Sequence, residues 1–437
     1  MANLGEVKAH ATRLYAQSHP LHALRLYDAI VQSAPLDFDA RLKAADCLVP
    51  LGEAEHAVKV YRAVGWYALK AGHPLLTIVI ARVLETLNAE KADLEAALVV
   101  RYGSESELIG KMAARLHLPA ATTQVSPPDL RTAPVDRFIS EASARAATCT
   151  DSFDEFPPTL HPIPLLSTLS EEAFRRVLGT LQVLRLPDGA HVIREGEPGQ
   201  SFYFLAGGNV RVYAIDALGR QTELAKLGEG AVFGEMALIS AQPRSASVQV
   251  VGEADLLEVT RDSMSALADE LEPVAVALHQ FTRQRLLNNL MATNRLFKPF
   301  DRPQQRDLLR RFTSHDVAPG TDIIHQGDEG LGLFVVLSGE MEVIREEDGK
   351  TTALATLRSG DVFGEMALIR SDRTTATVRA AKQGTVLFLA RDYVTRLVAI
   401  APDLKKYLEA LADDRQMATE LLSAAGDVVP DDEIIFI

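Results

Sequence analysis

One stretch occurs twice in this chain of 437 residues and constrains its fold more than any other feature. Residues 227–248 read LGEGAVFGEMALISAQPRSASV, and residues 357–378 read LRSGDVFGEMALIRSDRTTATV. The segment FGEMALI is identical in the two copies, which lie 130 positions apart. A repeat of that length is far longer than the unit of a solenoid and therefore indicates a duplicated domain.

Each copy carries the parts of a phosphate-binding turn. Gly234 and Gly364 allow a close backbone approach and unusual dihedral angles. The residues that follow suit a short helix, whose free N–H groups attract an anion. Arg244 follows in the first copy and can bind a phosphate through two parallel hydrogen bonds. Glu235 only accepts hydrogen bonds when ionised and suits a sugar hydroxyl.

The stretch resembles the phosphate-binding cassette of the cyclic-nucleotide-binding domain family. This family includes the catabolite activator protein and the regulatory subunits of cyclic-AMP-dependent protein kinase. The pattern Phe-Gly-Glu-x-Ala-Leu, a spacer and Arg-x-Ala-Thr/Ser-Val is matched from Phe233 to Val248. The resemblance implies that Gly and Glu meet the ribose 2′-hydroxyl, and that Ala, Arg and Ser meet the cyclic phosphate. The expected first site comprises Gly234, Glu235, Met236, Ala237, Arg244 and Ser245.

The second copy departs from the pattern at the arginine. Thr374 stands at that position, and Arg373 comes one residue earlier, where the first copy has Pro243. A hydrogen bond to a charged group is worth about 1.5–3 kcal/mol. Its loss would weaken phosphate binding by roughly one to two decades. We therefore expect the second site to be weak, empty or retuned; it comprises Gly364, Glu365, Met366, Ala367, Arg373, Thr374 and Thr375. The alternative is that both copies are structural remnants whose glycines serve turns.

Composition restricts the class of protein. The formal net charge is −14, which argues against a large nucleic-acid-binding surface. The two cysteines show no metal-ligand spacing and suit a reducing compartment. No basic-then-apolar leader and no apolar run of membrane-spanning length is present. We expect a cytoplasmic protein with no bound metal and no membrane contact.

Residues 1–118 are expected to be helical. Ala23 and Ala57 lie 34 positions apart, and so do Tyr27 and Tyr61. This period resembles that of the tetratricopeptide repeat, and such repeats offer a groove to a peptide of a protein partner. The alternative is a helical bundle that merely packs on the barrels. Residues 119–158 are rich in proline and predict a linker, with a short helix over residues 136–147.

The remainder predicts an α+β multidomain protein in which two jelly-roll β-barrels with flanking helices follow the helical repeat region. We place the first barrel domain at residues 159–294, the second at 295–412 and a C-terminal tail at 413–437. Ser170 is a suitable N-cap for the helix that opens the first domain. The closing helix of the second, Pro402 to Leu411, carries Tyr407, which suits base stacking or a core contact. The resemblance implies that the helix after the first barrel caps the base; Arg285 is a candidate for this cap, and the alternative is that it lies on a solvated helix surface.

These features together predict a non-catalytic signalling receptor. A cyclic nucleotide would bind barrel 1, and also barrel 2 if the second site is competent, and would switch a protein partner through the helical regions. Cyclic AMP is the first choice; the hydroxyl of Ser245 keeps cyclic GMP open, and a cyclic dinucleotide also remains open. The rivals are a scaffold with degenerate barrels and a kinase regulatory subunit, although the linker lacks an Arg-Arg-x-Ser/Ala pseudosubstrate. We find no signature of an enzyme.

Overall fold

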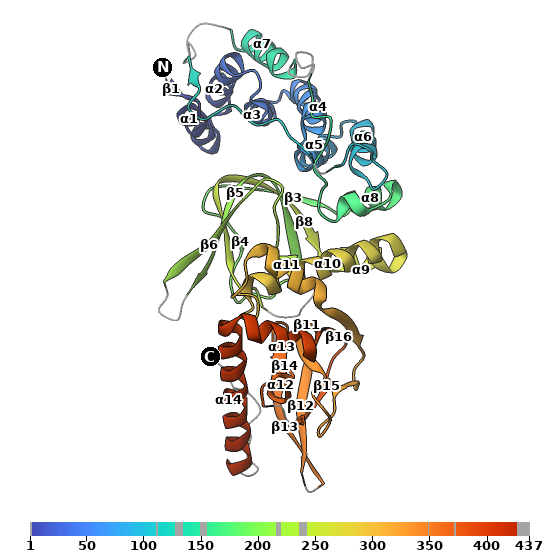
Figure 1. The fold of residues 1–437 in the computed structure, drawn as a ribbon. Coiled ribbons are helices and arrows are strands. Elements are labelled where there is room, and N and C mark those ends of the chain that lie inside the picture. Colours follow the sequence, from blue (N-terminus) through green and yellow to red (C-terminus); the bar gives the residue numbers. More distant parts are fainter. Residues whose placement is uncertain are drawn as a thin grey trace. The chain divides into compact units, whose positions relative to one another are not determined.

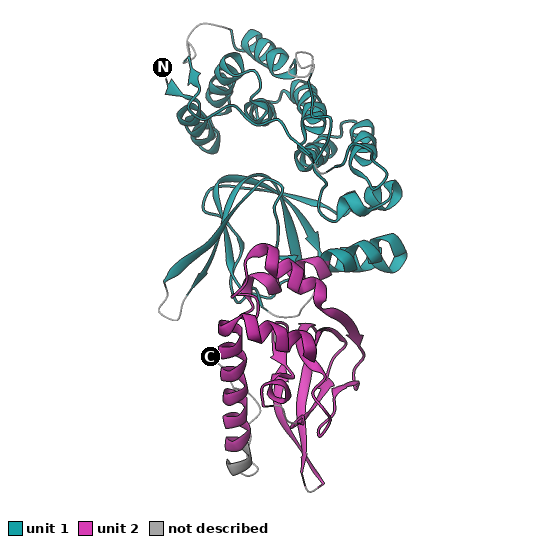
Figure 2. Ribbon diagram, viewed as in Figure 1, with its two compact units in different colours: residues 1–281 teal, residues 282–437 magenta. Residues whose placement is uncertain are grey.

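The computed structural model describes residues 2–110, 112–126, 134–148, 155–215, 220–235, 243–347, 349–370 and 373–425. The chain divides into two compact units, Met1–Phe281 and Thr282–Ile437 (Figure 2). Within the described stretches, no helix combines the length and the apolar character that crossing a membrane requires. The expected α+β architecture, helices first and antiparallel β-domains after them, is confirmed (Figure 1).

Six helices make up the first part of the chain. They are α1 (Leu4–Ala16), α2 (Pro20–Ser33), α3 (Phe38–Leu48), α4 (Ala54–Ala71), α5 (Pro74–Thr86) and α6 (Ala92–Tyr102). Helices α1 and α3 begin 34 positions apart, as do α2 and α4. Ala23 and Ala57 are fully buried, and Tyr27 and Tyr61 are each 2% exposed. The helical prediction is confirmed, while the likeness to tetratricopeptide repeats stays a prediction.

The segment predicted as a linker carries packed structure in its described part. Strand β2 (Gln124–Val125) pairs with β1 (Ala2–Asn3), and the predicted short helix is present as α7 (Val135–Ala147). Helix α7 packs on α2, α3 and α4. Arg145 on α7 forms an ion pair of 2.8 Å with the buried Asp28 of α2.

Barrel 1 is one antiparallel sheet in which the strands run β3-β8-β5-β6, with β4 on β8 and β7 on β5. The strands are β3 (Gln182–Leu186), β4 (His191–Ile193), β5 (Ser201–Ile215), β6 (Gln221–Gly228), β7 (Val232–Phe233) and β8 (Ser247–Thr260). The 3-10 helix η1 (Leu166–Thr168) and helix α8 (Glu171–Leu178) precede the sheet, and α9 (Arg261–Glu270) follows it. Ser170 caps α8 by accepting from the amide of Ala173, as the sequence predicts.

Both faces of the barrel 1 sheet carry buried apolar side chains, which belong to two different cores. Leu205, Val250 and Leu256 belong to a core inside the barrel. Phe202 and Phe204 belong instead to a second core, which they share with the N-terminal helices. This packing agrees with the alternative of a helical bundle on a barrel, and partner docking by the helices stays a prediction.

A network of ion pairs also links the N-terminal helices to barrel 1. The guanidinium of Arg185 on β3 donates to both carboxylate oxygens of Asp46 on α3, at 2.7 and 2.8 Å. Its Nε donates to Asp255 on β8, at 2.9 Å. The helices and barrel 1 therefore form one packed body in unit 1.

Barrel 2 belongs to unit 2 and consists of two antiparallel four-stranded sheets, β10-β15-β12-β13 and β14-β11-β16-β9. Its strands are β9 (Thr313–Val317), β10 (Asp322–Ile324), β11 (Gly332–Ser338), β12 (Met341–Glu347), β13 (Lys350–Leu357), β14 (Val362–Phe363), β15 (Thr377–Ala380) and β16 (Gly384–Ala390). Its helices are α11 (Arg302–Arg311), α12 (Glu365–Ile369), α13 (Arg391–Ile400) and α14 (Pro402–Ala425). Helix α10 (Glu272–Thr293) begins in unit 1 and ends in unit 2.

Helix α14 is longer than the sequence predicts. The expected end at Leu411 is wrong, because α14 continues to Ala425. Pro402 occupies its first turn, and the next glycine or proline along the chain is Gly426. A helix without an internal breaker can run on, and here the extra turns lie against barrel 2.

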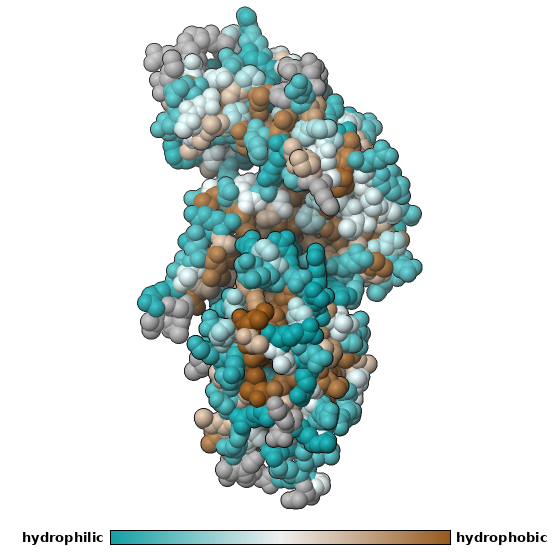
Figure 3. Space-filling model, viewed as in Figure 1, coloured by the Kyte–Doolittle hydropathy of each residue, from teal (hydrophilic) through white to brown (hydrophobic). Residues whose placement is uncertain are grey.

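Polar side chains cover most of the face shown in Figure 3, with separate apolar patches among them. Large exposed apolar side chains of the described residues are scattered over different elements, for example Val100 on α6, Ile400 on α13 and Met417 on α14. Scattered apolar side chains are normal on a protein surface and by themselves mark no docking site.

Candidate ligand-binding sites

The cassette of barrel 1 begins at a glycine with a left-handed backbone. Gly234 follows β7 and has φ of +78°. A Cβ at this position would lie 3.0 Å from Nη1 of Arg244 and 3.0 Å from Ile193. Only glycine combines this dihedral angle with so close an approach. Glu235 follows in the described part, whereas Met236 and Ala237 lie outside the described residues.

Arg244 lies against this turn. Its Nη1 donates to the carbonyl of Gly234 at 2.8 Å, and its Nη2 donates to the carbonyl of Ser201 at 2.6 Å. Across the described parts of the chain, no carboxylate forms an ion pair with it. Burial lowers the pKa of Arg244, because partial desolvation disfavours the charged guanidinium. A half-buried cation whose two hydrogen bonds go to neutral backbone carbonyls is well placed to take up an anion.

The backbone shows which residue of barrel 2 corresponds to Arg244. The amide of Arg244 donates to the carbonyl of Glu197 at 2.9 Å. The amide of Thr374 donates to the carbonyl of Asp328, also at 2.9 Å. Thr374 therefore occupies the place of Arg244, as counting along the sequence predicts.

Arg373 corresponds to a proline of barrel 1 and is directed elsewhere. It forms an isolated β-bridge with Glu329, just as Pro243 does with Pro198. Its side chain is exposed, and Nη1 donates to the carbonyl of Gly327 at 2.7 Å. Arg373 does not line the cavity described below. The structure thus separates it from the other predicted residues of site 2.

Thr374 and Thr375 differ in what their hydroxyls do. The Oγ1 of the buried Thr374 donates to the carbonyl of His325 at 2.5 Å. The exposed Thr375 makes a sulfur contact of 3.8 Å with Met366. Ser245, the counterpart of Thr375 in barrel 1, is also exposed.

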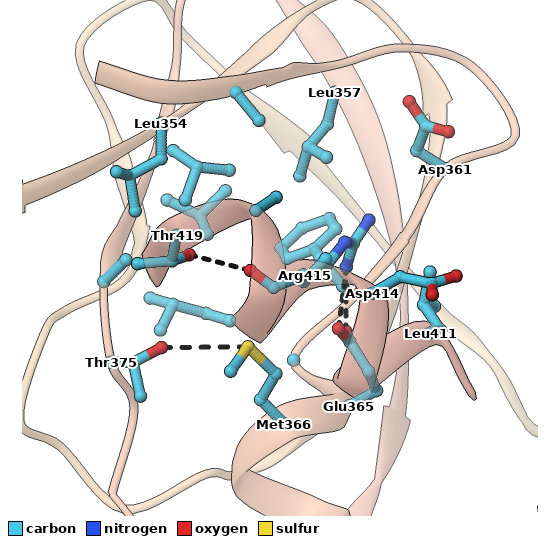
Figure 4. Close-up of a pocket in the computed structure, with 18 of the residues that line it drawn as sticks. Leu354, Leu357, Asp361, Glu365, Met366, Thr375, Leu411, Asp414, Arg415 and Thr419 are labelled. Carbon is cyan, nitrogen blue, oxygen red and sulfur yellow. Dashed lines mark hydrogen bonds and ion pairs between the residues drawn. The ribbon is translucent and has the colours of Figure 1, made fainter. Parts of the chain in front are cut away.

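A cavity of about 380 Å³ opens in barrel 2 beneath α14 (Figure 4). The predicted residues Gly364, Glu365, Met366, Ala367, Thr374 and Thr375 all line it. Gly364 has φ of +83°, which repeats the turn of barrel 1. The structure therefore brings six of the seven predicted residues of site 2 to one cavity.

Glu365 is the buried charge of this cavity. It is 1% exposed, and both of its carboxylate oxygens accept from Nη1 of Arg415, each at 2.9 Å (Figure 4). Arg415 lies on α14, four residues beyond the helix end predicted from the sequence, and was not among the predicted site residues. The available signal was the spacing of Tyr407, Leu411 and Arg415 at steps of four, which places them on one helix face.

Tyr407, which the sequence suits to base stacking or to a core contact, lines the same cavity, and the choice between these roles stays a prediction. Burial raises the pKa of its hydroxyl, which therefore stays protonated at neutral pH. Arg285 lies on α10 in unit 2 and does not line this cavity. Its expected role as a cap over barrel 1 stays a prediction.

Comparison with known proteins gives matches for both barrels. The family model of the cyclic nucleotide-binding domain matches residues 183–270 and 314–400. A cAMP-dependent protein kinase regulatory subunit of Yarrowia lipolytica is 30% identical over 54% of this chain and 58% of its own length. The cGMP-dependent protein kinase egl-4 of Caenorhabditis elegans is 30% identical over 55% of this chain and 30% of its own length. The chain thus spans only about a third to three fifths of these relatives.

One solved structure that matches is the regulatory domain of Toxoplasma gondii PKA in complex with cAMP. It is 24% identical and covers 57% of this chain and 92% of its own chain, with a TM-score of 0.28.

Proposed function

We propose that this chain, which contains two cyclic nucleotide-binding domains and is related to regulatory subunits of cAMP-dependent protein kinase, binds a cyclic nucleotide in barrel 1. The observation that carries the proposal is Arg244, a half-buried guanidinium beside the Gly234 turn with only carbonyl partners among the described residues. Cyclic AMP is the first choice of ligand, because relatives are cAMP-dependent. Cyclic GMP is the second, because another relative is cGMP-dependent and Ser245 supplies a hydroxyl.

The bound phosphate would replace the carbonyl partners of Arg244. Arg244 ties the Gly234 turn to the start of β5, where it holds the carbonyl of Ser201. A phosphate accepts hydrogen bonds from a guanidinium more strongly than a neutral carbonyl does. Binding would therefore loosen or re-aim the start of β5.

Strand β5 connects this event to the rest of unit 1. The hydroxyl of Ser201 lies 2.9 Å from that of Tyr203, which donates to Glu258 on β8 at 3.1 Å. Helix α5 packs on β5 and β8. A shift at Ser201 is thus placed to reach the N-terminal helices, where we propose that a protein partner gains or loses its docking site. The chain would act as a regulator without catalysis of its own.

The similarity to kinase regulatory subunits favours one particular partner class as a second candidate, a protein kinase catalytic subunit. Addition of this protein would then inhibit such a kinase, and cyclic AMP would relieve the inhibition. Unchanged kinase activity in both conditions would exclude this candidate and leave another protein partner.

The proposal is tested by ligand-induced stabilisation of the full-length protein. Cyclic AMP at about 100 times its Kd should stabilise the binding unit by about 2.7 kcal/mol. Arg244→Ala should weaken binding by about 10- to 100-fold, because a charged hydrogen bond to phosphate is lost. Arg211→Ala is the matched control, since Arg211 of β5 bonds to Gln249 and lies outside the cassette. Equal binding by wild type and Arg244→Ala would refute the proposed site.

A further inference from the structure

We infer that barrel 2 is a site for an uncharged ribonucleoside rather than for a cyclic nucleotide. This inference rests on the proposed function, because it treats barrel 2 as the duplicate of a ligand site. It goes further in assigning barrel 2 a different class of ligand.

The cavity has the size and the walls of a ligand site. Its volume of about 380 Å³ falls within the range of roughly 300–1,000 Å³ that is typical of small-molecule pockets. Most of the wall is apolar and comes from barrel strands and from α14; it includes Ile324, Val343, Leu354, Leu357, Val378 and Leu411. Such walls suit the two faces of a flat aromatic base, which are apolar.

The position that would anchor a phosphate carries no cation. Thr374 replaces the arginine, and its hydroxyl has the backbone carbonyls of His325 at 2.5 Å and Asp328 at 3.2 Å as acceptors. Arg373 does not line the cavity. Helix α12 has five residues, and its N-terminus offers a partial positive charge where the arginine of barrel 1 offers a full one.

The charges that do line the cavity disfavour an anion. They are the carboxylates of Asp361, Glu365 and Asp414 against the guanidiniums of Arg295 and Arg415. Arg415 is already paired with Glu365, and the side chain of Arg295 is exposed to solvent. A phosphate entering here would lose hydration without gaining a buried partner.

Glu365 supplies what a ribose needs. An ionised carboxylate only accepts hydrogen bonds and has about four acceptor sites, of which Arg415 uses one on each oxygen. The carboxylate is buried, so its remaining sites are best satisfied by hydroxyl donors of a ligand. Two vicinal hydroxyls next to an aromatic ring system, all without charge, describe a ribonucleoside.

The test uses calorimetry on full-length Arg244→Ala protein, in which the phosphate anchor of barrel 1 is removed. The titrants are adenosine, inosine, guanosine, their 2′-deoxy counterparts, cyclic AMP and cyclic GMP. We expect at least one ribonucleoside to bind at one site per chain. Its 2′-deoxy form should bind about 10-fold more weakly, because it lacks a hydroxyl donor for Glu365. Both cyclic nucleotides should also bind about 10-fold more weakly, because their phosphate meets no cation at the position of Thr374.

Substitutions in barrel 2 test whether the measured heat of nucleoside binding comes from that barrel. Glu365→Gln, made in the Arg244→Ala protein, should weaken nucleoside binding by about 10- to 100-fold. Glu409→Gln is the control, because it makes the same change on α14 outside the cavity. Thr374→Arg supplies the missing cation and should shift the preference from nucleoside to cyclic AMP, which remains informative if Glu365→Gln does not fold.

Two results would overturn the inference: no ribonucleoside binds to folded protein, or a cyclic nucleotide binds barrel 2 at least as tightly as any ribonucleoside. Both differ from failure of the proposed function, which is loss of cyclic-nucleotide binding in the wild type. If wild-type protein binds neither cyclic AMP nor cyclic GMP while Arg244→Ala binds a nucleoside, the first proposal is refuted and the second is supported.

Discussion

At the scale of single residues, one backbone frame holds two different side chains. Arg244 and Thr374 make the same backbone hydrogen bond, yet only the first presents a cation to its cassette. Counting from the shared FGEMALI segment is sufficient to predict this correspondence. Counting cannot predict that Arg373 lies outside the cavity of barrel 2. Nor can it predict that Arg415, 50 positions beyond Glu365, pairs with the carboxylate of Glu365. Those outcomes depend on tertiary packing rather than on local pattern.

The cassette glycine of barrel 2 should be intolerant of a side chain. Gly364→Ala would place a Cβ 2.7 Å from the carbonyl oxygen of Gly332 in a backbone with φ of +83°. We expect a loss of about 1–2 kcal/mol for the dihedral angle alone, and more for the contact. Gly360→Ala is the control, since it has φ of +98° with open space around the new atom. Equal urea midpoints for the two variants would contradict the predicted contact.

At the scale of elements, the 34-residue period of the helices could be predicted from the positions of alanine and tyrosine. A buried alanine lets two helices approach closely, and a buried tyrosine fills the space between them. The docking of α7 could not be predicted, because its Pro-rich surroundings indicate a linker, although its buried face comprises Phe138, Ile139, Ala142 and Ala146. The extension of α14 to Ala425 could have been predicted from the absence of a helix breaker before Gly426, but its contact with the cavity of barrel 2 could not, because spacing shows a helix face without showing what that face covers.

Alkaline pH should destabilise the N-terminal helices. Burial raises the pKa of Tyr27, Tyr61 and Cys47 in α2, α4 and α3. Their contribution to stability is present below their unfolded pKa values, near 8.5–10, and is lost as the pH rises above them. Urea unfolding of unit 1 should therefore show a falling midpoint from pH 8 to pH 11. The double variant Tyr27→Phe and Tyr61→Phe should show a shallower fall; an identical slope would count against this assignment.

The ion pair between α14 and barrel 2 should hold the helix in place. Arg415→Ala leaves Glu365 buried without its partner, which we expect to cost about 1–3 kcal/mol. Faster amide exchange along α14 would report the loosened helix. Combining Arg415→Ala with Glu365→Gln should cost less than the sum of the two single changes. Strict additivity would mean that the two side chains do not stabilise each other.

At the scale of the whole molecule, the sequence predicts a duplicated barrel domain. It does not predict that the chain divides into the compact units Met1–Phe281 and Thr282–Ile437. Periodicity shows that a strand or helix has an apolar face without showing what covers it. Phe202 and Phe204 are covered by the helices rather than by the barrel interior. The predicted domain boundaries at 118, 158, 294 and 412 remain predictions.

Removal of the first 110 residues should therefore harm barrel 1. Its outer face would expose Phe202, Phe204, Leu257 and Val259, which are now fully buried. We expect the shortened chain to aggregate or to lose its cooperative unfolding, while a fragment of residues 1–281 stays folded. Solubility and circular dichroism of the two proteins provide the check. A soluble shortened chain with an unchanged barrel 1 transition would show that the shared core is dispensable.

The central claim is that barrel 1 is the cyclic-nucleotide site and that Arg244 makes it so. The most direct measurement is calorimetry of wild-type full-length protein with cyclic AMP and with cyclic GMP, alongside Arg244→Ala. We expect one site per chain for one of these nucleotides, with an affinity about 10- to 100-fold weaker in Arg244→Ala. Two equal sites would contradict the assignment of barrel 2, and no heat from either nucleotide would contradict the claim itself.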